Sequence, residues 1–164
     1  MLTKENIKQL VRGFLHEACW YLGINDSQIS IGYMPIPVPM KIVMLLKESD
    51  VIVIDTNLLA NVIERNTYTT LRINIYSVAR EIYQRRKRQA EGTQEDLKAD
   101  EIDACAFAYA LCFLNGLNMI IPHKFVDNWH PRILHILNNE FHENCVLHSF
   151  PDPQFKGEFC YSAK

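Results

Sequence analysis

The chain has 164 residues, of which 48% are hydrophobic and 22% charged, a composition typical of one soluble folded domain and not of a disordered tail or a fibre. Its 17 Lys and Arg against 19 Asp and Glu leave a net charge of −2, so no global basic field favours a nucleic-acid backbone or an anionic membrane. Uncharged apolar stretches fall short of the roughly 20 residues that span a bilayer, and the N-terminus lacks the apolar core of a signal peptide. We therefore expect a single cytoplasmic domain over residues 1–164, with neither nucleic acid nor membrane as a partner.

The first elements alternate between helical and extended patterns. Thr3 is a suitable N-cap, apolar residues then recur at helical spacing as far as Leu22, and Gly23 stands where a helix should end. A β-branched run from Gln28 to Tyr33 predicts a strand, which the alternating prolines after it would stop.

Two further strand candidates, Lys41 to Lys47 and Val51 to Asp55, are separated by a stretch as short as a hairpin loop. Both carry the β-branched enrichment of buried strands. The pattern predicts a small, mostly antiparallel sheet.

From Thr67 the apolar period changes to that of an amphipathic helix of about six turns, which ends in the basic run 85–88. Acidic residues begin the segment that follows. We interpret cations at one helix C-terminus and anions at the next N-terminus as complements of the helix macrodipoles, not as a nucleic-acid patch. Thr93 followed by Asp96 resembles a capping box for the next helix, expected over 94–114. Residues 104–114 carry no charge, which predicts burial on nearly every face.

The remaining residues give weaker patterns. His130 to Phe141 is a candidate helix that Pro131 limits at its start, and the tail after about residue 150 is expected to be irregular. The five cysteines include no CxxC pair, so we expect reduced and mostly buried thiols. The six histidines form no i, i+4 pair, which argues against a metal site built from them. The predicted fold class is α+β, with helices packed on the short sheet.

The predicted long helix contains the sequence Ala79-Arg80-Glu81-Ile82-Tyr83-Gln84, where a zincin would have Ala-His-Glu-Leu-Gly-His. In that motif two histidines on one helical face bind Zn²⁺, and the Glu between them takes a proton from the metal-bound water. The run Glu101-Ile102-Asp103-Ala104-Cys105-Ala106-Phe107-Ala108 then looks like the E-x-x-A-x-x-F-A pattern of glutamate-ligand zincins. With the order of elements, these residues resemble the compact metallopeptidases of the ImmA/IrrE type.

The resemblance implies a zincin-like domain in which Glu81 falls on the general base and Glu101 on the carboxylate ligand. Arg80 and Gln84 replace both histidines, however, and Arg keeps its proton and repels a dication while Gln is a poor zinc ligand. We therefore expect a degenerate metallopeptidase without a metal or another cofactor. Its binding cleft would comprise the vestigial positions together with Ser77, namely Ser77, Arg80, Glu81, Gln84 and Glu101.

Removing Zn²⁺ from such a cleft would leave its carboxylates without a cation. A guanidinium can hydrogen-bond a carboxylate in bidentate fashion, so we predict an Arg80–Glu101 ion pair with Gln84 hydrogen-bonding nearby. For Asp103 we expect a role in complementing the helix N-terminus.

The leading functional hypothesis is a catalytically inactive metallopeptidase-like protein that binds a protein or peptide partner through the former active-site cleft. One alternative is an active hydrolase with a non-standard metal site that uses Glu81 and Glu101, or an enzyme with a non-metal activity built around Glu81. A structural subunit that forms homo-oligomers through an apolar surface is another alternative.

Overall fold

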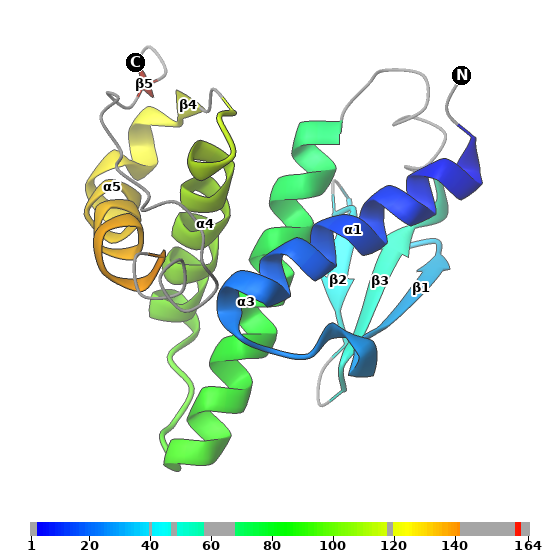
Figure 1. The fold of residues 1–164 in the computed structure, drawn as a ribbon, viewed down its shortest axis with the longest axis horizontal. Helices are drawn as coiled ribbons and strands as arrows, with labels where there is room; N and C mark the ends of the chain where they lie inside the picture. The colour runs from blue at the N-terminus through cyan, green and yellow to red at the C-terminus, as the bar shows by residue number, and fades with distance from the viewer. Residues whose placement is uncertain are drawn as a thin grey trace.

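The computed structural model describes residues 3–39, 41–46, 49–57, 68–117, 120–141 and 160–161. Within these residues the fold is α+β, with four α-helices and a three-stranded mixed sheet (Figure 1). None of the described helices is both long and apolar enough to span a membrane. The helices are α1 (Lys4–Leu22), α3 (Tyr68–Glu91), α4 (Leu97–Leu114) and α5 (Val126–His135), and the strands of the sheet are β1 (Ser30–Met34), β2 (Val43–Leu45) and β3 (Val51–Asp55).

Helix α1 begins and ends as its sequence predicts. The Thr3 side chain accepts a hydrogen bond from the Asn6 backbone N–H, and the Asn6 side chain accepts one from the Thr3 backbone, which completes a capping box. Gly23 ends the helix with φ 69°, a left-handed conformation that glycine adopts without a steric penalty.

The predicted hairpin is present, because β2 and β3 pair antiparallel with Leu45 opposite Ile52. The sheet is not mostly antiparallel, however, since β1 pairs with β3 in parallel and β3 is the central strand. The proline-rich segment after β1 explains the difference. Its prolines lack the backbone N–H groups that a hairpin ladder needs, and the chain reaches the far edge of the sheet before β2 begins.

Helix α3 lies at the centre of the molecule, with the sheet and α1 on one side and α4 and α5 on the other (Figure 1). One hydrophobic cluster joins Leu71, Ile75 and Ile82 of α3 to the sheet, to α1 and to α4. The predicted contact between the helix of Arg80 and the helix of Glu101 is confirmed. The predicted burial of the uncharged half of α4 is confirmed by its buried residues, Ala104, Ala106, Phe107, Ala108, Ala110, Leu111 and Cys112.

Two helix starts differ from the predictions. Helix α4 is capped by Asp96, whose side chain accepts a hydrogen bond from the Ala99 N–H, so the capping box expected at Thr93 does not form. Helix α5 begins at Val126, before His130, and includes Pro131. It continues into a single π-helical turn, Ile136–Glu140.

The C-terminal tail lies largely outside the described residues. Its described part, β5 (Cys160–Tyr161), pairs in parallel with β4 (Ile120–Ile121), so the irregular tail that the sequence suggests includes a short strand. Among the described cysteines, Cys19, Cys105 and Cys112 are free thiols, as expected, and Cys19 and Cys112 are buried. Burial raises the pKa of Cys19 and that of Cys112 to about 12, which disfavours their reactive thiolate form.

Candidate functional site

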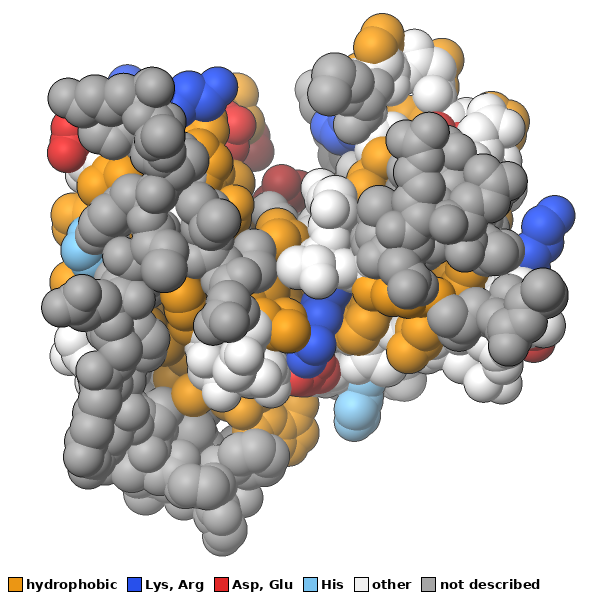
Figure 2. All heavy atoms as spheres, turned by 90° about the horizontal axis from the view of Figure 1, so that it is seen from above, with side chains coloured by type: hydrophobic (Ala, Val, Ile, Leu, Met, Phe, Trp, Pro, Cys, Tyr) orange, Lys and Arg blue, Asp and Glu red, His pale blue; other side chains and the backbone are white. Residues whose placement is uncertain are grey.

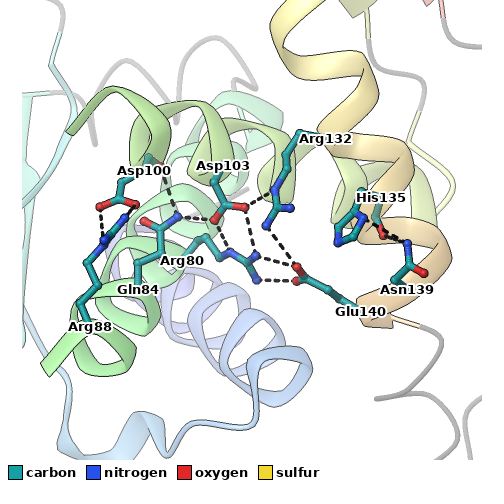
Figure 3. A network of polar contacts seen from close by, with 9 residues as sticks. All are labelled: Arg80, Gln84, Arg88, Asp100, Asp103, Arg132, His135, Asn139 and Glu140. Atoms are coloured by element: carbon teal, nitrogen blue, oxygen red, sulfur yellow. Dashed lines mark hydrogen bonds and ion pairs between the residues drawn. The ribbon is translucent and has the colours of Figure 1, made fainter. Parts of the chain in front are cut away.

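Arg80 occupies the contact between α3, α4 and the π-helical turn, where only 4% of its side chain is exposed. Its Nε and Nη2 donate to the Asp103 carboxylate at 2.7 and 3.1 Å. Its Nη1 and Nη2 donate to the Glu140 carboxylate at 2.8 and 3.1 Å. The guanidinium therefore binds one carboxylate along each of two edges (Figure 3). Burial acts to lower the pKa of Arg80, but the two carboxylates outweigh this effect and raise it, so the side chain stays charged.

The Asp103 carboxylate accepts hydrogen bonds from three side chains. It accepts from Arg80, from Arg132 Nε at 2.6 Å, and from the Gln84 side-chain amide. Burial acts to raise the pKa of Asp103, but its hydrogen bonds and its attraction to the two arginines hold that pKa below the ordinary value. Asp103 is therefore a buried anion at neutral pH.

Arg132 on α5 closes the cluster, because its Nη2 lies 3.3 Å from Glu140 Oε1. We call the four residues Arg80, Asp103, Arg132 and Glu140 the Arg80 network. It contains two cations and two anions and connects α3, α4, α5 and the π-helical turn (Figure 3). Arg80 and Asp103 are its buried members, whereas 30% of the Glu140 side chain and 36% of the Arg132 side chain are exposed.

The predicted Arg80–Glu101 ion pair is wrong, and the partners of Arg80 are Asp103 and Glu140. Positions 101 and 103 are two residues apart and therefore about 200° apart around a helix, so only one of them faces α3. Asp103 faces α3 and Glu101 is exposed. The expectation that Asp103 serves the helix N-terminus is wrong for the same reason, because its side chain points inward to the network. The expectation of a Gln84 hydrogen bond nearby is confirmed, with Asp103 as acceptor.

Glu81 and Glu101 lie near each other on a different face of the α3–α4 pair. Glu81 is exposed at the surface of α3, but the protein groups around its carboxylate reduce its hydration, and together with the negative charge of Glu101 they raise its pKa above the ordinary value. The Cys105 thiol belongs to the same neighbourhood, because burial and the charges of both glutamates raise its pKa to about 11. Ser77 is partly buried, one turn before Glu81 on α3. The residues expected to form one cleft therefore lie on two faces.

A groove of about 850 Å³ opens beside the Arg80 network, between α3, the first half of α4, and α5. Arg80 and Gln84 line it, whereas Ser77, Glu81 and Glu101 are not among its lining residues. A smaller hollow of about 210 Å³ lies beyond Glu140 and is lined in part by the rings of Tyr21 and Phe107. Arg80, Tyr83, Lys87 and Glu140 line both spaces, so the groove and the hollow adjoin each other at the Arg80–Glu140 ion pair.

Three of the four cations in the basic run at the end of α3 form ion pairs with two carboxylates. Arg85 and Arg86 both pair with Asp50, at 2.6 and 2.7 Å, and Arg88 pairs with Asp100 at 2.7 Å. At the opposite end of the molecule, seen from above in Figure 2, the described charged side chains are scattered.

The donor set at the motif positions does not fit a zinc ion. Arg80 contributes a permanent cation, and the Gln84 amide nitrogen is engaged as a donor to Asp103, which leaves one carboxylate as a ligand of suitable charge. Among the described residues, no group of three or more His, Cys, Asp or Glu side chains is placed to hold a metal ion.

Sequence reasoning missed Arg132 and Glu140, the two members of the network that come from the C-terminal part of the chain. The sequence did contain an indication of these two residues. Their charges are isolated within the candidate helix 130–141, in which Ile133, Ile136 and Leu137 are buried. Comparisons with protein-family models, curated proteins and solved structures give no match.

Proposed function

We propose that this protein is a catalytically inactive, metallopeptidase-like binding or regulatory module, and that it binds a protein or peptide partner through the groove beside Arg80. The observation that carries the proposal is the meeting of Arg80, Gln84 and Asp103. In the sequence motif, Arg80 and Gln84 stand at the two histidine positions, and Asp103 on the adjacent helix contacts both. The carboxylate is Asp103 and not Glu101, which the resemblance implied as the ligand. Histidines at positions 80 and 84 would form a two-histidine, one-carboxylate site with Asp103, and the Arg80 guanidinium takes the place of the ion.

The Arg80 guanidinium supplies a positive charge next to the carboxylates, as a metal would, but it cannot act as a Lewis acid. A guanidinium does not coordinate or activate a water molecule, and both of its carboxylate-binding edges are occupied. The groove beside it, with charged side chains of both signs, supports recognition of a polar ligand such as a peptide.

The double variant Arg80→His/Gln84→His tests the proposed ancestry of the site. With Asp103 it would present two imidazoles and a carboxylate, and we expect micromolar or tighter zinc binding by calorimetry, provided that circular dichroism shows the native fold. Adding Asp103→Asn should weaken zinc binding at least about tenfold, because it removes the third ligand. Adding Glu101→Gln, the matched control, should leave zinc affinity unchanged. A folded double variant that binds no zinc would remove the basis of the proposal.

The alternative, a hydrolase that uses Glu81 and Glu101, is favoured by one observation. The raised pKa of Glu81 brings this carboxyl group closer to the range in which a side chain can exchange protons during catalysis. Hydrolysis of unstructured peptides by the wild-type protein, lost in a folded Glu81→Gln variant and retained in Arg86→Ala, would support this alternative over the inactive module.

A further inference from the structure

We propose that Glu140 is a built-in occupant of a carboxylate-binding site formed by Arg80 and Arg132, and that the ligand of the groove is a carboxylate on a peptide, which displaces Glu140. This inference rests on the proposed binding role of the groove. It adds the chemical class of the ligand and an autoinhibitory contact that controls access to the site.

The two carboxylates bound to Arg80 differ in how firmly they are held. Asp103 belongs to the middle of α4, is buried, and keeps three partners on α3 and α5. Glu140 is the last residue of a single π-helical turn, and 30% of its side chain is exposed. Single π-helical turns are uncommon and frequently occur at functional sites. Glu140 is therefore the carboxylate that can leave without dismantling the contact between α3 and α4.

Arg80 stays oriented when Glu140 leaves. Its Nε and Nη2 remain bound to Asp103, and its guanidinium carbon lies 4.9 and 5.2 Å from the ring centres of Tyr83 and Phe107. The vacated Nη1–Nη2 edge would face the space between the groove and the smaller hollow. A preoriented guanidinium edge with a second arginine beside it is well suited to a carboxylate.

The surroundings of that edge combine a further cation with an accessible aromatic ring. Departure of Glu140 would join the groove to the hollow, whose lining includes Lys87 and the partly buried Tyr83. A ring beside a carboxylate-binding arginine can contact the side chain of a peptide's carboxyl-terminal residue, and Lys87 adds a second charge that suits its carboxylate. An acidic side chain carries the same group without the apolar part, so the two sources can be distinguished experimentally.

The test compares binding of N-acetyl-phenylalanine to the full-length wild-type protein and to Glu140→Ala, by calorimetry or NMR titration. Because a tethered carboxylate competes at a high effective concentration, its removal should tighten binding by about tenfold or more. N-acetyl-phenylalanine amide, which lacks the carboxylate, should bind neither protein. N-acetyl-glutamate amide carries its carboxylate on the side chain and represents an acidic residue as the source. It should bind Glu140→Ala more weakly than N-acetyl-phenylalanine does.

Glu95→Ala is the matched control, because Glu95 is exposed and lines neither the groove nor the hollow. It should bind N-acetyl-phenylalanine as the wild type does. If Glu140→Ala does not fold, Glu140→Gln keeps the side-chain volume without the charge and should show the same direction of change. Equal affinity of the wild type and a folded Glu140 variant would overturn the inference. Failure of the folded Arg80→His/Gln84→His variant to bind zinc would instead contradict the proposed ancestry of the site, and it would not affect the inference about the carboxylate-binding site.

Discussion

Replacing Arg80 by alanine would leave two carboxylates in a largely buried site without their central cation. Breaking a buried ion pair by removing one partner typically costs about 3–5 kcal/mol, because the remaining charge stays desolvated. Asp103 would keep Arg132 and Gln84, and Glu140 would keep Arg132, so we expect the lower end, about 3 kcal/mol. At about 2–4 °C per kcal/mol for a domain of this size, the melting temperature should fall by about 6–12 °C.

The matched control is Arg86→Ala on the same helix. Arg86 binds Asp50 at 2.7 Å, but 29% of its side chain is exposed and Asp50 would keep Arg85. A solvated pair of this kind is worth about 0–1 kcal/mol. Urea and thermal unfolding followed by circular dichroism would compare the two variants, with similar urea m-values as the condition for comparison. Equal losses of stability would refute the reasoning that the Arg80 network is buried and energetically coupled.

Two further predictions concern the core and the effect of acid. Ala108→Asp should unfold the protein, because an unpaired carboxylate at this fully buried position carries a desolvation penalty comparable to the total stability. Ala99→Asp, at an exposed position in the first turn of the same helix, should be tolerated. Circular dichroism of the two purified variants would measure the difference. The folded-state pKa of Asp103 lies below its ordinary value of 3.8, so its stabilising contribution is present above that pH and is lost as the pH falls through the folded-state pKa. As the pH is lowered, the free energy of unfolding should therefore fall less steeply for Asp103→Asn than for the wild type. Asp50, whose pKa is also lowered, should account for part of the slope that remains. Identical slopes for the two proteins would contradict the stabilising role of the Asp103 carboxylate.

The sequence predicted the elements well where a local pattern and a cap agreed. Thr3 and Gly23 delimit α1 because both act through contacts within a few residues of themselves. The uncharged half of α4 could be assigned to the core because a helix without charge has no side suited to water. The direction of β1 could not be predicted, because local residue patterns do not determine which edge of the sheet the chain reaches after Pro35.

The candidate site could be predicted only in part. The motif positions indicated Arg80 and Gln84 correctly as neighbours of a carboxylate on the next helix. The choice between Glu101 and Asp103 depends on the rotation of α4 about its own axis, which is set by tertiary packing against α3 and α5. Glu140 is 60 residues from Arg80 in sequence, so its place in the network follows from tertiary structure alone.

The central position of β3 in the sheet has a consequence for the order in which the fold assembles. Its pairing with β2 is local in sequence, whereas its pairing with β1 joins residues about twenty positions apart. Local hairpins close in microseconds, and pairings across longer loops carry a greater entropic cost. The β2–β3 hairpin is thus the natural first unit during folding. The free edge of β3 then pairs with β1, and the apolar face of the hairpin, with Ile52 and Ile54, provides a surface against which the helices pack.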